Sequence, residues 1–183
     1  MTFINKIIIS DFKTFNNMTS APFRIETLNK KILLGIKLEM SLAQNQTGEL
    51  WRSFMLRRKE INNAVGKDLY SLQEYGADYF KAFRLENQFV KWAAVEVSDA
   101  TAIPEAMEAL QLQGGLYAVF TYIGSSNDTQ IFQYIYSEWL PTSGYDLDDR
   151  PHFEVLGEKY KNNSPDSEEE IWIPIKHKHG VQE

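Results

Sequence analysis

Apolar and polar residues alternate along several stretches of the chain, which is typical of β-strands with one buried face. In residues 24–40, and again in residues 106–122, a polar or glycine-rich turn interrupts the alternation once. Each of these stretches therefore predicts two strands joined by a tight turn. Four further runs predict strands, at 68–75, 88–97, 152–160 and 170–176.

Two stretches change to a spacing of three or four between apolar residues, which is the period of an amphipathic helix. The first is GELWRSFMLRRKEI at 48–61, with Thr47 as its predicted N-terminal cap. The second is TQIFQYIYSEWL at 129–140, with Asp128 as its predicted cap and Pro141 as its predicted end. The chain is therefore expected to contain two successive sets of elements, each with four strands and one long helix.

The two halves of this pattern repeat each other at a spacing of about 82 residues, which indicates an internal duplication. Each half has the order strand, strand, helix, strand, strand. Trp92 and Trp172 correspond in the last strand of each half, at a spacing of about 80. The other corresponding pairs are Glu26 and Glu108, Leu28 and Leu110, Leu34 and Leu116, Leu38 and Phe120, Met40 and Tyr122, Leu50 and Phe132, and Phe54 and Tyr136.

The duplication predicts two halves at about 23–97 and 106–176, joined by a linker at 98–105. A unit with one apolar sheet face and one amphipathic helix buries more surface when it pairs with its copy. We therefore expect a pseudo-twofold axis between the halves, with the cleft at their junction as the ligand site. Residues 1–22 are interpreted as an N-terminal extension and residues 177–183 as a C-terminal tail.

Composition narrows the functions that this scaffold can perform. The 183 residues fit one domain, and a net charge of −6 with a pI of about 5.2 argues against direct nucleic-acid binding. The absence of cysteine excludes disulfides and cysteine metal sites, and we expect no metal or other cofactor. No apolar run is long enough for a signal peptide or a membrane span, so a cytoplasmic protein is expected. Aromatic residues make up 13% of the chain, and we expect some of them to line a pocket.

Three motifs in the second half resemble the GyrI-like effector-binding domain, which also occurs in AraC-type and MerR-type multidrug-sensing transcription regulators. They are GGLYAVFTYIGS at 114–125, YIYSEWLPTSGYDLDDRPHFEV at 134–155 and IWIPIK at 171–176. The resemblance covers residues 23–176. It implies an α+β fold in which duplicated β-α-β-β units, with two main helices, form a curved antiparallel sheet or partial barrel. It also implies a hydrophobic ligand cleft at the junction of the halves.

Family members that bind lipophilic cations place an acidic residue in this cleft, and the Pro-x-Phe-Glu motif carries that role onto Glu154. We expect the protein to depart from the regulators in having no helix-turn-helix segment, because 22 leading residues are too few to form one. We therefore expect a stand-alone protein that binds a lipophilic, cationic or aromatic compound, for drug sensing or transcription regulation, without contacting DNA itself.

The residues themselves leave the orientation of Glu154 open. In its strand, His152, Glu154 and Leu156 share one face and Phe153 and Val155 share the other, and the alternation does not tell which face is inside. An uncompensated buried carboxylate is costly, so an acid among rings would select a cation, whereas an exposed Glu154 would be an ordinary surface residue. The further candidates for the ligand site, each of which could instead be a core or surface residue, are Glu96, Trp92, Tyr117, Trp139, Trp51 and Phe120.

Two other functions stay open at this point. Some stand-alone relatives of the family hydrolyse reactive electrophiles, and in such an enzyme Glu154 would activate water or protonate a leaving atom, with help from Tyr117. Others inhibit gyrase, which would make the chain a protein-interaction module whose acidic surface contacts a partner. The acidic run SPDSEEE at 164–170 is interpreted as a solvated hairpin loop. The sequence is compatible with a monomer or a homodimer.

Overall fold

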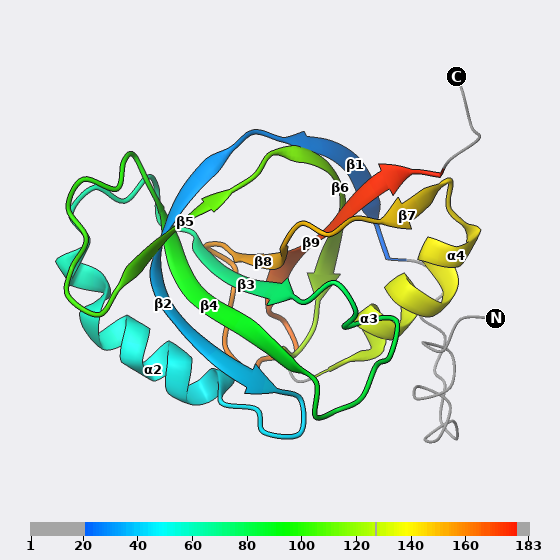
Figure 1. The fold of residues 1–183 in the computed structure, drawn as a ribbon, viewed down its shortest axis with the longest axis horizontal. Coiled ribbons are helices and arrows are strands. Elements are labelled where there is room, and N and C mark those ends of the chain that lie inside the picture. Colours follow the sequence, from blue (N-terminus) through cyan, green and yellow to red (C-terminus); the bar gives the residue numbers. More distant parts are fainter. Residues whose placement is uncertain (1–20, 127, 179–183) are drawn as a thin grey trace.

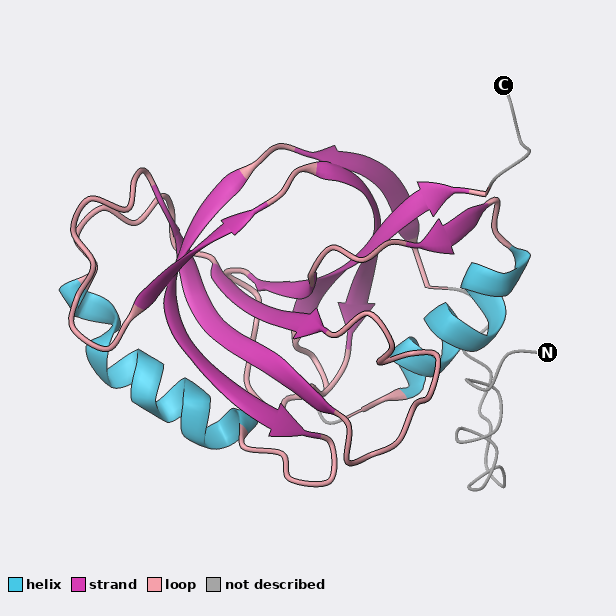
Figure 2. Cartoon of the chain, in the orientation of Figure 1, coloured by secondary structure: helices cyan, strands magenta, loops and turns pink. Residues whose placement is uncertain are grey.

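The fold is an α+β arrangement in which one curved antiparallel sheet carries its helices on one face (Figure 1, Figure 2). The computed structural model describes residues 21–126 and 128–178. Most of the predicted N-terminal extension and the end of the predicted tail lie outside these residues. The strands are β1 (Phe23–Leu28), β2 (Lys31–Ser41), β3 (Leu69–Tyr75), β4 (Gln88–Val97), β5 (Glu108–Leu112), β6 (Gly115–Ile123), β7 (Tyr145–Leu147), β8 (His152–Leu156) and β9 (Glu168–His177).

The sheet confirms the predicted duplicated α+β fold. Its strand order is β1-β6-β9-β8-β3-β4-β2-β5, and β7 pairs with β9 beside this path. If each strand is replaced by its counterpart in the other half, the order reads the same from the opposite end. The registers agree with this symmetry, because Lys37 faces Trp92 in the first half and Val119 faces Trp172 in the second. The pseudo-twofold axis therefore passes between β3 and β8.

The first strand of each half pairs with the other half. β1 pairs with β6, and β5 pairs with β2, so neither predicted strand–turn–strand segment closes as a hairpin. The chain at the start of β6 passes close to the end of β1, since a Cβ added to Gly114 would lie only 2.6 Å from the carbonyl oxygen of Leu28. Figure 1 shows β1 arching from β2 across to β6. This exchange ties the two halves into one sheet.

The two helices differ in regularity. Helix α2 (Thr47–Arg57) is continuous and ends in a 3₁₀ turn, η2 (Arg58–Glu60). The second helical segment consists of α3 (Gln130–Tyr134), a π-helical turn η3 (Ile135–Trp139) and α4 (Leu140–Thr142), so the helix ends one residue after Pro141, which was predicted to mark its end. None of these helices is long and apolar enough to cross a membrane.

Neither predicted cap occupies the N-cap position, which falls on Gln46 for α2 and on Thr129 for α3. Thr47 begins α2 and donates its own N–H to the Asn45 side chain. Asp128 lies one residue before the N-cap of α3, although its carboxylate accepts the N–H of Gln130 at 2.9 Å. The predicted strand at 152–160 is also too long, since β8 ends at Leu156 and a turn follows it.

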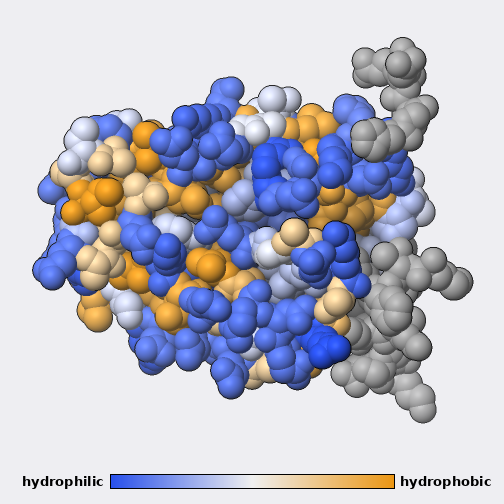
Figure 3. Space-filling model, viewed as in Figure 1, coloured by the Kyte–Doolittle hydropathy of each residue, from blue (hydrophilic) through white to orange (hydrophobic). Residues whose placement is uncertain are grey.

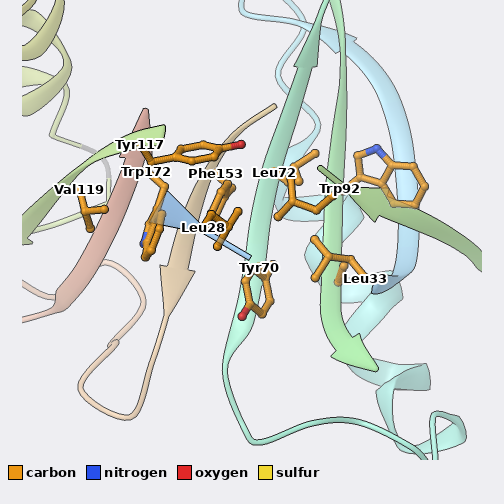
Figure 4. Close-up of a cluster of buried hydrophobic side chains, with 11 residues drawn as sticks. Leu28, Leu33, Tyr70, Leu72, Trp92, Tyr117, Val119, Phe153 and Trp172 are labelled. Atoms are coloured by element: carbon orange, nitrogen blue, oxygen red, sulfur yellow. The ribbon is translucent and has the colours of Figure 1, made fainter. Parts of the chain in front are cut away.

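The apolar interior forms three clusters. On one face of the sheet, Leu34, Phe89 and Ala93 pack beneath α2, and a second cluster with Phe120 and Ile171 packs beneath the second helical segment. The third cluster lies on the opposite face, where its rings and aliphatic side chains face one another (Figure 4). Its members are Leu28, Leu33, Tyr70, Leu72, Trp92, Ala94, Leu112, Tyr117, Val119, Phe153 and Trp172.

Some large apolar side chains remain on the surface. Leu56 on α2 is 77% exposed and Ile123 at the end of β6 is 65% exposed. Figure 3 shows hydrophobic residues interspersed among hydrophilic ones on the face that it views. Isolated exposed apolar residues are ordinary on a folded domain, so they do not by themselves mark a binding surface.

Candidate functional site

Glu154 lies on the helix-bearing face of the sheet. Ala93, Ser71, Glu154 and Ile171 face one another in register across β4, β3, β8 and β9. Ala93 packs beneath α2 and Ile171 beneath the second helical segment. Since residues directly opposite in a sheet share a face, Ser71 and Glu154 occupy the strip between the two helices, next to the pseudo-twofold axis.

The carboxylate of Glu154 is largely enclosed but has few partners. Its side chain is 15% exposed. One oxygen accepts the side-chain amide of Gln73 at 3.1 Å, and the other lies 3.8 Å from the ammonium of Lys91. Gln73 lies opposite Lys91 in the register of β3 and β4, so all three side chains project from the same face.

Aromatic rings from both halves lie near the Glu154 carboxylate. The hydroxyl of Tyr136 lies 2.8 Å from Nδ1 of His152, which is buried two residues before Glu154. Phe80 stacks on the His152 ring with centroids 5.5 Å apart, and Tyr75 meets the same ring edge-on at 5.0 Å. We call the residues Gln73, Tyr75, Phe80, Lys91, Tyr136, His152 and Glu154 the central site.

Burial keeps the histidine and tyrosine rings of the central site in their neutral forms. It lowers the pKa of His152 to about 3, so the imidazole is neutral at physiological pH. Burial, followed by the negative charge of Glu154, raises the pKa of Tyr136 well above its ordinary value. Burial also raises the pKa of Tyr75, to which the Tyr136, Tyr79 and Glu154 groups add. The rings therefore present neutral, hydrogen-bonding edges beside one carboxylate and one ammonium.

A second carboxylate, Glu169 of β9, lies close enough to Glu154 and Lys91 for their charges to act on it, and it is 9% exposed. Burial, followed by the charge of Glu154, raises its pKa to about 7, and the charge of Lys91 opposes this shift. The sequence interpretation of 164–170 as a solvated loop is therefore wrong at its end, because β9 begins at Glu168 and Ser167 and Glu169 are both buried.

Local backbone features position two of the rings. Tyr136 belongs to the π-helical turn η3, and single π-helical turns within helices occur frequently at functional sites. Phe80 comes from the connection between β3 and β4, residues 76–87, which contains turns rather than a helix or strand. A ring carried by such a connection is easier to displace than one carried by a strand.

The other residues predicted for the ligand site lie in two places. Trp92 and Tyr117 belong to the cluster on the face opposite Glu154, where Tyr117 donates a hydrogen bond to the carbonyl oxygen of Pro151 (Figure 4). Glu96 is on that face too, where it binds Lys31 at 2.6 Å and accepts from the Tyr70 hydroxyl at 3.1 Å. The structure does not bring these three residues together with Glu154.

The remaining three aromatic candidates share the helix-bearing face with Glu154. Trp51 projects from α2, with its ring centroid 6.0 Å from that of Phe54. Phe120 and Trp139 pack on each other beneath the second helical segment, with centroids 5.0 Å apart. They form the apolar flank of the strip that contains Glu154.

Sequence reasoning missed Gln73, Lys91, Glu169, His152, Tyr136, Tyr75 and Phe80. The structure aligns Gln73 with Glu154 in the repeat, since Gln73 faces Lys91 and Glu154 faces Ile171 in the matching strand pairs, but the spacings of 82 and 80 in the sequence do not pair them. One signal could have found His152. The alternation in 152–156 already placed His152 on the same face as Glu154.

A shallow hollow of about 420 Å³ lies elsewhere, near the linker between the halves. Its walls come from residues 60–63 and 99–104 and contain none of the residues of the central site. Its polar side chains are bonded within the loop itself, as when Thr101 donates to Asp99. It therefore offers no group that requires a ligand.

Residues 21–176 match the family model described as the GyrI-like small molecule binding domain. The chain belongs to this family. The match confirms the family resemblance inferred from the motifs of the second half, and it includes both halves of the duplication. As a GyrI-like domain, the chain carries a small-molecule-binding fold whose two copies meet at the central site.

Similar proteins agree with this assignment. The chain is 27% identical over 166 residues to the transcriptional regulator BrlR of Pseudomonas aeruginosa, an alignment that covers 86% of this chain but only 59% of the regulator. Among solved structures, SAV2435 bound to tetraphenylphosphonium superposes with a TM-score of 0.67 at 18% identity, covering 85% of this chain and 94% of that one. A hydrolase from Listeria innocua superposes with a TM-score of 0.55 at 8% identity, covering 85% and 92%. At these identities the structural matches show the shared fold alone.

Proposed function

We propose that this GyrI-like domain binds a lipophilic aromatic compound with a positive charge at the central site, where Glu154 meets the charge. The observation that carries this proposal is the state of Glu154, which is 15% exposed and receives one neutral amide and one distant ammonium. A carboxylate so enclosed is stabilised by a cation that comes close to it.

The rings around Glu154 suit the rest of such a ligand. Phe80, Tyr136 and His152 stack or tilt against one another with centroids 5.5–6.2 Å apart. An aromatic cation among them would gain cation–π attraction of about 0.5–2 kcal/mol for each well-placed ring. Phe80 is the ring that a ligand would replace, because it comes from the connection 76–87 and lies directly on His152.

The relatives support the same class of ligand. The structural relative SAV2435 is described as bound to tetraphenylphosphonium, a lipophilic cation with four aromatic rings. The relative BrlR is a transcriptional regulator, which is compatible with a sensing role for the domain, and this chain spans about 59% of its length. We propose drug or metabolite sensing as the biological use of binding.

The proposal is tested by titrating the protein with tetraphenylphosphonium in a calorimeter. We expect Glu154→Gln to weaken binding about tenfold or more, because the ligand loses its counter-charge while the size and shape of the side chain are kept. Glu96→Gln is the matched control, since Glu96 is also a strand glutamate paired with a lysine but faces the opposite side. Equal affinity of the wild type and Glu154→Gln would refute the role of Glu154.

A second candidate function, hydrolysis of an electrophile with a strained ring, is favoured by Glu169. Two carboxylates in different environments can divide the roles of base and acid. The Glu154 carboxylate would take a proton from water as its oxygen attacks the ring carbon, and protonated Glu169 would give a proton to the atom that leaves. Tyr117, the helper predicted from the sequence, projects from the opposite face. Turnover of a strained electrophile that is lost in Glu169→Gln supports this function, and binding without product argues against it.

A further inference from the structure

Lys91 lies in the central site with few partners for its ammonium. Its side chain is 12% exposed, and its only ion pair within the described residues is the one with Glu154 at 3.8 Å. An ammonium has three N–H donors, and that of Lys91 makes no hydrogen bond with any group in the described part of the chain. Its donors are therefore left to solvent or to a ligand.

Another lysine of the sheet, by contrast, makes an ion pair at hydrogen-bonding distance. Lys31 on β2 bonds Glu96 at 2.6 Å, although its side chain is more exposed, at 26%. Charge-assisted N–H···O bonds usually span about 2.7–2.9 Å. The separation of 3.8 Å between Lys91 and Glu154 is therefore an electrostatic contact and not a hydrogen bond.

The position of Lys91 makes its donors available to a ligand of the central site. Phe89 and Ala93, its neighbours of the same parity on β4, pack beneath α2, so Lys91 is on the helix-bearing face. Its ammonium and the amide of Gln73 approach the two oxygens of the same carboxylate. A molecule that meets Glu154 is thus within reach of Lys91 as well.

The carboxylate of Glu154 and the ammonium of Lys91 favour ligand groups of opposite charge. A purely cationic molecule that approaches Glu154 also approaches the ammonium of Lys91, which repels it. A molecule that carries an acidic group beside its positive charge reverses this penalty, because the acidic group provides the acceptor that Lys91 lacks.

We propose that Lys91 determines ligand specificity by binding an acidic group, so that the central site prefers aromatic compounds with both a positive charge and an acidic group over purely cationic analogues. This inference rests on the proposed function, since it concerns the same site. It assigns the anionic part of the ligand to Lys91 and the cationic part to Glu154.

The test compares two dyes that share one ring system. Rhodamine 110 is a zwitterion with a free carboxylate, and rhodamine 123 is its cationic methyl ester. Titration calorimetry at neutral pH should show that the wild type binds rhodamine 110 about tenfold more tightly. Lys91→Met should abolish or reverse this preference, and Lys91→Arg, which retains the charge, should preserve it. Lys31→Met is the control on the opposite face and should leave the preference unchanged.

Tetraphenylphosphonium separates failure of this inference from failure of the proposed function. If tetraphenylphosphonium binds but the wild type binds the two rhodamines equally, or prefers the ester, the role of Lys91 is overturned and the proposed function stands. A preference for rhodamine 110 that survives in folded Lys91→Met overturns it too. If none of the three compounds binds, the proposed function fails and this inference fails with it.

Discussion

The two halves of the domain share a scaffold but differ in the residues beside the axis between them. Strand order and register repeat from one half to the other. Around the central site, however, the equivalent positions differ in charge and polarity. In order of first and second half, the pairs are Ser71 and His152, Gln73 and Glu154, Phe89 and Glu169, Lys91 and Ile171, and Phe54 and Tyr136.

The difference shows how a duplicated fold avoids placing two identical carboxylates next to its pseudo-twofold axis. Residues near a pseudo-twofold axis lie close to their own counterparts, so identical acids there would repel each other or share a proton. Here Gln73 occupies the position equivalent to Glu154 and donates its amide to it at 3.1 Å. One half thus contributes the carboxylate and the other contributes a neutral donor.

The helices show the same contrast. Phe54 on the continuous helix α2 is fully buried and carries no polar group. Its counterpart Tyr136 lies in a π-helical turn and directs its hydroxyl to His152. The regular helix thus supplies packing at this position, whereas the irregular helix supplies a polar group to the central site.

The largest expected effect concerns the shared scaffold. Leu72 and Phe153 face each other across the axis, and both are almost completely buried in the cluster opposite the helices. We expect Phe153→Ala to lower the free energy of unfolding by about 3–5 kcal/mol and Leu72→Ala by about 2–5 kcal/mol, because each leaves a cavity. Urea unfolding measures both. A loss below about 1 kcal/mol in either variant would show that the halves do not share one core.

The next effect concerns a charge that only the second half carries. Folding raises the pKa of Glu169 from an ordinary value of 4.5 to about 7, so between these values the folded state binds more protons than the unfolded chain. Its contribution to the free energy of unfolding therefore falls as the pH rises from about 4.5 to 7 and is constant above that. Glu169→Gln removes this fall.

The measurement is the free energy of unfolding of wild type and Glu169→Gln from pH 4.5 to 8. The difference between them should grow in favour of the variant by up to about 3 kcal/mol, since one pKa unit corresponds to about 1.4 kcal/mol. Because the wild type and the variant both contain His152, its own pH dependence cancels. A difference that does not change with pH would contradict the burial of an ionisable Glu169.

The smallest effect converts one residue of the second half to its counterpart in the first. Tyr136→Phe removes the hydroxyl that lies 2.8 Å from Nδ1 of His152, and we expect it to lower the free energy of unfolding by about 1 kcal/mol. Tyr160→Phe should cost less, because its hydroxyl bond to Asn162 is exposed and spans 3.4 Å. Equal losses in the two variants would argue against the buried bond.

Much of the fold was predictable because its signals are local. Period-2 alternation located the principal strands, and the repeat of Trp92 and Trp172 predicted the duplication. The exchange of β1 and β5 was not predictable, since Glu26 and its partner Tyr117 are far apart in the sequence and nothing in either local pattern names the other strand. The short β7 was missed because three residues carry no recognisable period.

The candidate site was less predictable than the fold. Alternation shows that Trp92 and Glu96 share a face, but only the register with β3 and β8 shows that this face lies opposite Glu154. Glu169 was hidden in an acidic run, where composition suggests solvent and burial is decided by where β9 begins. Nothing in the sequence marked Lys91 as a site residue. Its proposed role depends on its ammonium having no hydrogen-bond partner in the described residues, which only the three-dimensional structure shows.

The central claim is that the ligand binds between the helices, beside Glu154, and not in the aromatic cluster on the other face. A crystal structure of the protein with tetraphenylphosphonium tests this directly. We expect the ligand in contact with Glu154 and Tyr136, with Phe80 displaced from His152. A ligand beside Trp92 and Tyr117, with the contacts of Glu154 unchanged, would contradict it.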